Sequence, residues 1–511
     1  MTRSTAFRPS AAALWLLGAV LTACGTPASP TTPAGNSDGV YAPEDSFTAT
    51  WRLQDAFKIR PQANTTAPTI DGVSLPRGGS VTIPGYYVWD TWPLVGTDNQ
   101  LARVDGYYVM FMLSVPNTLN GQVLLPGKRH DIATIRYVYS KDGVSWKDGG
   151  YAFENPAGLN PHVVLGSRNW AGSAMLKDGQ VYLYYTATGV EGERTTPQSV
   201  PRQLTVPLAA PDTAGISPQS SCAYGCTVDG ISFRQRLALA VGTMKGDASG
   251  VKIAGAFAHR IVLEADGKLY QTEAQSKGSI IYSFRDPWIF KDPKDGNFYM
   301  LFEGNTGGNG DEQTCKPENI GDAAFASTVK LPADARYYNG NIGLAKAVGN
   351  DLTKWQLLAP ILNANCVNQQ TERPHLVFQD SRYYLFTDSH KFTFSTVPGL
   401  RDRGVDGVYG FVGNALRSKY VPLNKSALVI NNPVEQPYQA YSWWITQDKV
   451  TISFIDTWAV KPTESPESFG NLSPEKQKYG FGGTLAPSIK VQLSGAATSV
   501  QTTLPYGQLT P

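Results

Sequence analysis

The sequence is 511 residues long and almost balanced in charge, with 44 Lys and Arg against 42 Asp and Glu and a net charge of +2. This balance leaves no strong positive field to attract nucleic acid or an anionic membrane, so the sequence predicts no nucleic-acid partner. Aromatic residues make up 11% of the chain, and 50 Gly and 35 Pro residues interrupt it, which favours a β-rich protein with many turns.

The N-terminus has the pattern of an export signal. Arg3 and Arg8 precede an apolar run over residues 11–21, which is typical of a secretory signal and too short to span a bilayer. The run ends in Leu-Thr-Ala-Cys at Cys24, which resembles a bacterial lipobox; an ordinary signal with a chance cysteine is the alternative. We expect a signal peptide over residues 1–23, lipidation of Cys24, and a lipid-anchored protein outside the cell or on its surface.

The next segment has the composition of a tether. Residues 24–45 are rich in Gly, Pro, Ser and Thr, which cannot bury a core, so we expect a flexible linker. Residues 46–511 would then form one catalytic domain.

Five later segments combine aromatic and β-branched residues and end in polar ones, as buried strands do. They are GYYVMFMLSV from Gly106, VYLYYTATG from Val181, NFYMLFEGNTG from Asn297, RYYLFTDSH from Arg382 and VTISFIDTW from Val450. Residues 139–150 and 345–358 each predict an outer hairpin with a Trp on the returning strand. The pattern predicts an all-β fold, a five-bladed β-propeller with a central, funnel-shaped pocket.

Four cysteines remain after Cys24, an even number that favours two disulfides in an exported protein. Cys222 and Cys226 enclose only three residues, and a local bridge there would leave Cys315 to pair with Cys366. A metal site is disfavoured because no His lies at ligand spacing near the first pair.

Three acids from distant parts of the chain are candidates for catalysis. Asp90 lies between Trp89 and Trp92, Asp286 follows Arg and precedes Pro, and Glu372 precedes Arg and Pro. A retaining glycosidase needs one ionised carboxylate and one protonated carboxyl about 5 Å apart. We expect the two tryptophans to stack on a sugar ring beside Asp90. A single acid beside Arg is usually a structural ion pair, but three candidate acids in one fold favour catalysis.

These residues stand in motifs that resemble the levansucrase and inulosucrase family of fructansucrases. The matching motifs, spread over most of the chain, are VWDTWPL, NWAGSAML, SFRDP, FEGNTGG, QTERPH, DGVYGFV, QAYSWWI and FGGTLAP. The segments around Asp90 and Glu372 differ from those of the related invertases and fructanases, which share the RDP element and the five-bladed fold.

The resemblance implies a role for each acid. Asp90 would be the nucleophile that takes up the fructosyl group, Asp286 the transition-state stabiliser and Glu372 the acid/base. It also implies a set of substrate-binding residues, with Trp89, Trp170 and Arg285 at the fructosyl subsite and Gln370, Arg373, His390 and Tyr441 on the glucose or acceptor side. For His390, a hydrogen-bonded turn histidine is an equal alternative.

Two departures from the family pattern matter. Relatives usually carry Ser where this chain has Ala171, and that hydroxyl is expected to bond the nucleophile. Gram-positive members carry an acidic calcium ligand just before the acid/base, where this chain has Gln369 and Gln370. The pair of Cys315 and Cys366 resembles a disulfide of Gram-negative members, so we expect no calcium, no cofactor, and a bridge that stabilises the loop.

The resemblance therefore implies a secreted, monomeric sucrose fructosyltransferase, closest to Gram-negative levansucrases, that makes levan and partly hydrolyses sucrose. Its partners would be sucrose, fructan acceptors and water. The alternatives are a sucrose hydrolase or an inulosucrase on the same scaffold, and a non-catalytic sugar-binding propeller.

Overall fold

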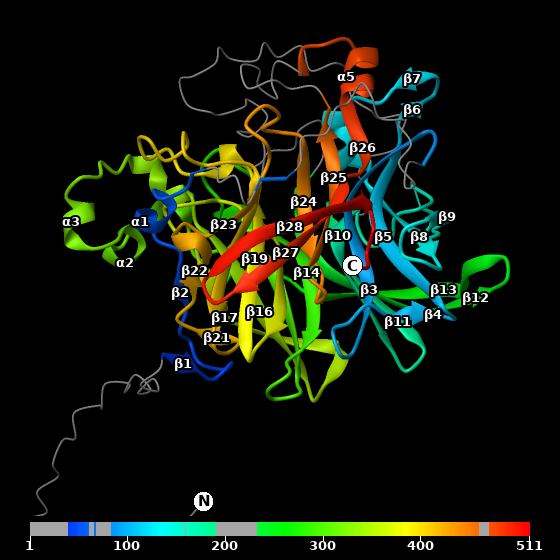
Figure 1. Cartoon of the computed structure of the whole chain (residues 1–511), viewed down its shortest axis with the longest axis horizontal. Coiled ribbons are helices and arrows are strands. Elements are labelled where there is room, and N and C mark those ends of the chain that lie inside the picture. Colours follow the sequence, from blue (N-terminus) through cyan, green and yellow to red (C-terminus); the bar gives the residue numbers. More distant parts are fainter. Residues whose placement is uncertain (1–38, 61–65, 68–82, 159, 191–231, 459–469) are drawn as a thin grey trace, which may run out of the picture.

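The structure is a computed structural model that describes residues 39–60, 66–67, 83–158, 160–190, 232–458 and 470–511. Antiparallel strands dominate it, with a few short helices (Figure 1). The all-β class that the sequence predicts is therefore confirmed. Within the described part of the chain, no helix is long and apolar enough to cross a membrane.

The strands form five antiparallel groups that follow one another along the chain. The first two groups are β3 (Tyr86–Gly96), β5 (Tyr107–Pro116), β8 (Thr134–Ser140) and β9 (Lys147–Tyr151), then β10 (Arg168–Lys177), β11 (Gln180–Thr188), β12 (Gln235–Asp247) and β13 (Gly250–Leu263). The third group is β14 (Phe284–Lys291), β15 (Phe298–Asn305), β16 (Gly340–Val348) and β17 (Asp351–Asn363).

The last two groups have shorter outer strands. The fourth is β18 (Glu372–Gln379), β19 (Arg382–Ser389) and β20 (Gly407–Gly413), with β22 (Val421–Pro422) and β23 (Leu428–Asn431) both paired to β20. The fifth is β24 (Ala440–Ile445), β25 (Val450–Thr457), β27 (Pro487–Ser494) and β28 (Ala497–Tyr506), with β26 (Phe481–Leu485) paired to β25.

The aromatic segments singled out in the sequence are the second strands of these groups: β5, β11, β15, β19 and β25. They are almost entirely buried because each lies between two paired strands and packs on both faces. The two expected outer hairpins are also present, as β8 with β9 and β16 with β17.

The first strand of each group, here called an inner strand, contacts the inner strand of the next group. The contacts run from β3 to β10, β14, β18 and β24, and β24 contacts β3 again. Between β3 and β10 the contact is a short parallel pairing, which joins the first two groups into one sheet. Residues far apart in sequence therefore meet along this circuit of inner strands.

Both ends of the described chain are tied to the groups. Near the N-terminus, β1 (Val40–Tyr41) pairs with β21 (Arg417–Ser418), and β2 (Ala49–Thr50) extends the third group along β17. Near the C-terminus, the Trp146 indole N–H donates to the Gly507 carbonyl at 3.0 Å, which ties the chain end to the first group.

The start of the fold corrects the predicted linker, which was expected to extend through residue 45. Tyr41 pairs with Arg417 and stacks on Phe47 with ring centroids 3.9 Å apart, and Glu44 forms an ion pair with Lys346. Residues 40–45 therefore belong to the described fold, because a tyrosine and a glutamate inside the polar stretch find partners on the domain.

The helices are short. In Figure 1, α1 (Leu53–Ala56), α2 (Pro317–Ile320) and α3 (Ala323–Ala326) lie together on one side of the molecule, and α5 (Pro474–Gly480) precedes β26. The disulfide between Cys315 and Cys366, with Cα atoms 5.7 Å apart, joins the segment before α2 to the loop that leads into β18.

Candidate active site

Every inner strand carries a β-bulge at the same place relative to its partner strand. The bulge residues are Asp90, Ala171, Asp286, Arg373 and Ser442. All except Ala171 have positive φ, between 44° and 59°, a strained conformation for residues with a Cβ atom. A bulge re-aims side chains and breaks the strand alternation, so this layer of five is a shared structural device.

The residues just before the bulges form a second layer: Trp89, Trp170, Arg285, Glu372 and Tyr441. The two layers contain the three predicted acids and all but two of the predicted substrate-binding residues. Asp90 and Asp286 lie inside strands and Glu372 begins one.

Arg285 joins two of the inner strands electrostatically. Its guanidinium bonds Glu303, the cross-strand partner on β15, with Nε 2.8 Å from Oε2, and reaches Glu372 Oε1 at 3.1 Å. Burial disfavours the charged form, but the carboxylates of Glu303, Glu372 and Asp286 outweigh it and raise the pKa of Arg285. Arg285 is therefore a fixed cation at the acid/base candidate.

Glu372 is held on its other oxygen by an aromatic pair. The Tyr441 hydroxyl donates to Glu372 Oε2, and the Tyr441 ring stacks on His390 with centroids 3.5 Å apart. His390 Nδ1 lies 2.8 Å from Asp406 Oδ2, and this neighbour raises the pKa of His390 even though burial lowers it. His390 is thus both a satisfied histidine and a neighbour of Glu372, with Nε2 4.0 Å from Oε2.

Asp90 and Asp286 are linked to Arg373, the bulge residue of β18. The Arg373 backbone N–H donates to Asp286 Oδ2 at 3.2 Å. Its guanidinium, 4% exposed, donates to the backbone carbonyls of Thr91 and Ser442. The side chain therefore lies buried against the backbones of β3 and β24, and its expected place near the glucose or acceptor side stays a prediction.

The carboxyl groups of Asp90 and Asp286 have raised pKa values. Burial raises the pKa of Asp286 to about 6, with Arg285 opposing the shift and the charges of Glu372 and Asp90 reinforcing it. Burial also raises the pKa of Asp90, opposed by Arg373 and by a hydrogen bond with the Ser442 side chain. Several carboxylates in one low-dielectric cluster are typical of catalytic sites.

The tryptophans differ from the expected clamp. Trp89 and Trp170 both meet His130 edge to face, and the Trp170 indole N–H donates to the His130 carbonyl at 2.9 Å. Trp92 is fully buried and stacks on Phe111. Because the bulge at Asp90 shifts the alternation, Trp92 points into the core and cannot flank Asp90 against a sugar.

The two glutamines before Glu372 are buried. Gln369 accepts the Asn339 backbone N–H on its side-chain oxygen at 2.9 Å, and the Gln370 carbonyl accepts the Ser389 hydroxyl at 2.8 Å. None of the recorded hydrogen bonds of Gln370 connects it to the acids. In the described ranges no group of three or more His, Cys, Asp or Glu could hold a metal ion, and the absence of calcium stays a prediction.

Several residues of the site were missed in the sequence. Glu303 lies opposite Arg285, and Asp388 lies opposite Glu372 on β19. Asp388 is fully buried, neither of its oxygens has a hydrogen-bond partner among the described residues, and burial raises its pKa well above the usual range. The hairpin register could have revealed both acids, whereas His130 and Ser442 carry no local signal.

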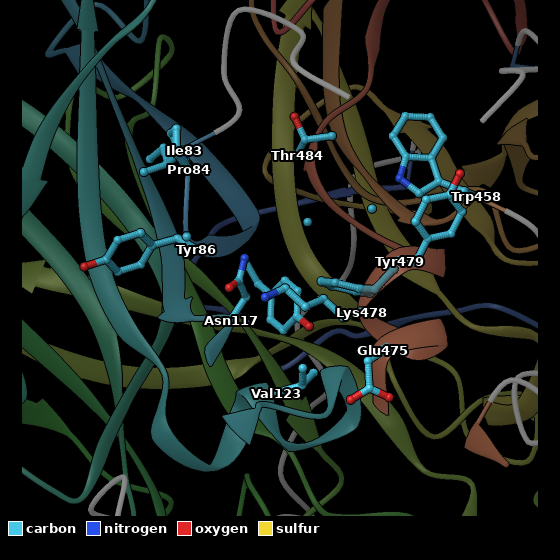
Figure 2. Close-up of a pocket in the computed structure, with 15 residues that line it drawn as sticks. Ile83, Pro84, Tyr86, Asn117, Val123, Trp458, Glu475, Lys478, Tyr479 and Thr484 are labelled. Carbon is cyan, nitrogen blue, oxygen red and sulfur yellow. The ribbon is translucent and has the colours of Figure 1, made fainter. Parts of the chain in front are cut away.

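A separate cavity of about 450 Å³ lies where β3 begins and is bordered by α5 and β26. Figure 2 shows Tyr86, Trp458, Lys478 and Tyr479 around it. None of the predicted site residues lines this cavity, so the chemistry is assigned to the cluster of acids. The predicted pair Cys222 and Cys226 and the predicted lipidation site Cys24 lie outside the described residues.

Comparison with known proteins connects this geometry to a family. A glycoside hydrolase family model described as levansucrase/invertase matches residues 40–510. A levansucrase of Rahnella aquatilis is 34% identical over 90% of this chain and 96% of its own length.

Two solved structures are similar over almost the whole chain. An inulosucrase from Halalkalicoccus jeotgali bound to kestose has 38% identity and a TM-score of 0.73, covering 91% of this chain and 98% of its own. A β-fructofuranosidase from Microbacterium saccharophilum has 30% identity and a TM-score of 0.71, covering 92% of this chain and 86% of its own. The family match over nearly the whole folded part, together with the clustered acids, shows that the chain belongs to the levansucrase/invertase family of glycoside hydrolases.

Proposed function

We propose that the protein is a sucrose-cleaving fructosyltransferase, a levansucrase that works with retention of configuration. The observation that carries this proposal is the meeting of Asp90, Asp286 and Glu372 from three separate strand groups, connected through Arg285 and Arg373. The names of the relatives support sucrose as donor and fructan as product. In the same proposal, the five strand groups are the blades of a five-bladed propeller and the inner strands line a central pocket.

The proposed reaction has two displacements at C2 of the fructosyl unit. An oxygen of Asp90 bonds to C2 while Glu372 gives its proton to the glucosyl oxygen, the bond between C2 and that oxygen breaks, and glucose leaves. Glu372 then takes the proton of an acceptor hydroxyl, whose oxygen displaces Asp90 from C2. Asp286, when ionised, accepts hydrogen bonds from fructosyl hydroxyls that strengthen in the transition state.

Surrounding residues support these roles. Arg285 and the Tyr441 hydroxyl hold the two oxygens of Glu372, which fixes the carboxyl for in-line proton transfer. Trp170 is partly exposed beside His130, and in this proposal it stacks on the fructosyl ring.

The decisive experiment is incubation of the purified mature protein with concentrated sucrose, with free glucose and free fructose measured separately. A levansucrase releases more glucose than fructose, and linkage analysis of the polymer yields β-2,6 bonds. Equal release of both sugars identifies a hydrolase. A polymer with β-2,1 bonds identifies an inulosucrase, an outcome that the similarity to an inulosucrase gives reason to measure. Release of neither sugar overturns the sucrase proposal in favour of a sugar-binding propeller.

We further propose that the protein is exported and anchored by lipid at Cys24, with the folded domain acting outside the cytoplasm as a monomer. The support is the signal-like sequence that ends in this cysteine. Replacing Cys24 by Ala should move the protein from the membrane fraction to the soluble fraction while its activity on sucrose is kept. Retention in the membrane would contradict the anchor.

A further inference from the structure

Phe392 is an exposed aromatic residue next to the candidate site. Its exposed fraction is 51%, and no other phenylalanine among the described residues is exposed. Single exposed hydrophobic side chains are common on proteins, so exposure alone assigns no role. Phe392 differs from such residues because its ring stacks on His390, which borders the acid/base candidate Glu372.

A series of ring contacts joins Phe392 to Glu372. The Phe392 ring stacks on His390 with centroids 5.1 Å apart and an angle of 21° between the planes, and His390 stacks on Tyr441 at 3.5 Å. The Tyr441 hydroxyl donates to Glu372 Oε2, and His390 Nε2 lies 4.0 Å from the same oxygen. Tyr441 is buried, His390 is partly exposed and Phe392 is exposed. The series of rings therefore runs from Glu372 to the protein surface.

The turn that carries Phe392 is held in place on both sides. Phe392 is the middle residue of a short 3-10 turn that begins at Lys391 and ends at Thr393. The Lys391 backbone N–H donates to Asp406 Oδ1 at 2.7 Å, and the other oxygen of Asp406 lies 2.8 Å from His390 Nδ1. The Thr393 hydroxyl donates to the His390 carbonyl at 2.8 Å. Because the turn is fixed before any ligand binds, little conformational freedom is lost when a ligand covers the ring.

The proposed reaction brings two sugars in turn to Glu372. This residue first protonates the oxygen of the leaving glucose and then takes the proton of an acceptor hydroxyl. The reacting unit of an acceptor therefore lies against Glu372, and the rest of a longer acceptor has to extend toward solvent. The rings of Tyr441, His390 and Phe392 follow such a path. An exposed aromatic ring packs well against the apolar C–H face of a sugar, whose hydroxyl groups stay in water.

We propose that Phe392 binds the second sugar unit of the acceptor, counted outward from Glu372, by stacking on its face. The ligand is a fructan chain or another oligosaccharide acceptor. This inference rests on the proposed function, because it presumes that Glu372 serves an acceptor sugar. It assigns Phe392 to acceptor binding and not to the cleavage of sucrose, whose glucosyl unit is the first unit at Glu372 and has no second unit beyond it.

The direct test measures binding of two sugars to the inactive Glu372→Gln variant by calorimetry. Kestose carries one fructosyl unit more than sucrose, so only kestose has a unit that reaches Phe392. Adding Phe392→Ala should raise the Kd of kestose about fivefold, as expected when the area under one sugar face is lost. The Kd of sucrose should stay unchanged. Phe392→Tyr keeps an aromatic face and should keep both Kd values.

A kinetic test uses the active enzyme with sucrose alone. In Phe392→Ala the share of fructosyl groups transferred, measured as glucose minus fructose relative to glucose, should fall and the products should become shorter. The kcat/KM for glucose release at low sucrose should stay at the wild-type value, because cleavage of the donor does not use this ring. Tyr479→Ala removes another exposed aromatic ring and is the matched control, which should leave the transferred share unchanged.

The outcomes distinguish this inference from the proposed function. Unchanged kestose binding in Phe392→Ala overturns the inference, and so does an equal loss for sucrose and kestose or an equal loss of transfer in Tyr479→Ala. If the wild type only hydrolyses sucrose, the transferase proposal fails, but the two Kd values still decide whether Phe392 binds a second unit. If the wild type does not cleave sucrose at all, the proposed function fails and this inference fails with it.

Discussion

Along each inner strand, the residues of the candidate site and the residues two positions later have very different surroundings. At the bulge and just before it lie mainly charged and polar side chains, several partly exposed, which form the candidate site. Two residues further on lies a buried layer, here called the plug, made of Trp92, Ser173, Trp288, His375 and Trp444. In the plug, His375 stacks on Trp444 at 5.2 Å, and Trp444 meets Trp288 edge to face.

The difference shows what the bulges do. In a regular strand, residues i and i+2 point to the same face. Here the bulge residues belong to the candidate site, whereas the residues two positions later pack in the plug. The bulge inserts one extra residue into the inner strand and so changes the alternation of its side chains. In β3, Asp90 is therefore part of the site while Trp92 packs in the plug. The buried plug limits the access of water to this side of Asp90 and Asp286, which agrees with the raised pKa values of these two carboxyl groups.

The largest expected effect comes from the site layer itself. Glu372→Gln keeps shape but removes the proton that leaves with glucose, so kcat for glucose release should fall by about 10²- to 10⁴-fold. The melting temperature should change little. The exposed Glu312 gives a matched Glu→Gln control that should keep full activity. A sugar-binding protein would instead show no turnover in either form and unchanged ligand affinity in the variant.

Substitutions in the plug should lower the stability of the protein more than they change its kinetics. Trp92→Ala leaves a large cavity, and we expect the free energy of unfolding to fall by about 3–5 kcal/mol, measured by urea denaturation. Trp92→Phe, which keeps most of the packing, should lose far less and keep the KM for sucrose. A raised KM in a fully stable Trp92→Phe variant would return Trp92 to the sugar-stacking role that its sequence suggests.

The acids of the site predict opposite responses of activity and stability to pH. Asp286, with a pKa raised to about 6, must be ionised to act, so kcat/KM should fall about tenfold per unit below roughly pH 6. The native state binds the Asp286 proton more tightly than the unfolded chain does. The contribution of Asp286 to stability therefore rises as the pH falls from about 6 toward the ordinary pKa of an aspartate. Activity that persists unchanged at pH 4.5 would contradict the raised pKa.

The smallest effect is expected at Asp388. Burial raises the pKa of this carboxyl, which has no hydrogen-bond partner among the described residues, so the fold favours its neutral form. Asp388→Asn should then change the unfolding free energy by less than about 1 kcal/mol at pH 7. Because ionisation of the wild type costs stability as pH rises, the variant should gain relative to wild type in urea titrations at pH 9. A large loss at pH 7 would show that the carboxylate is ionised and paired.

Much of the strand layout could be predicted from the sequence. Buried second strands are continuous aromatic and β-branched runs, and all five were found, because a strand covered on both sides needs apolar residues throughout. The family motifs indicated the three acids, and the structure brings them together. Tyr441 and His390 were also expected, and both lie at Glu372.

The errors share one cause. Local sequence cannot show a bulge, so Trp89 and Trp92 looked equivalent. Both are fully buried, but Trp89 meets His130 just before the bulge, whereas Trp92 stacks on Phe111 in the plug. Nor can it show contacts around the circuit, such as those of the Arg373 guanidinium with the backbones of Thr91 and Ser442. Both depend on which strands become neighbours, a property of the closed arrangement.

The tie between the two ends of the fold has a consequence for biogenesis. The bond from Trp146 to Gly507 spans 361 residues, and β24 must reach β3 before the circuit of inner strands is complete. Contacts this distant in sequence form late, because the intervening chain must first be made and ordered. A ribosome-bound chain that already carries all three acids therefore still lacks β24, the strand that closes the circuit of inner strands.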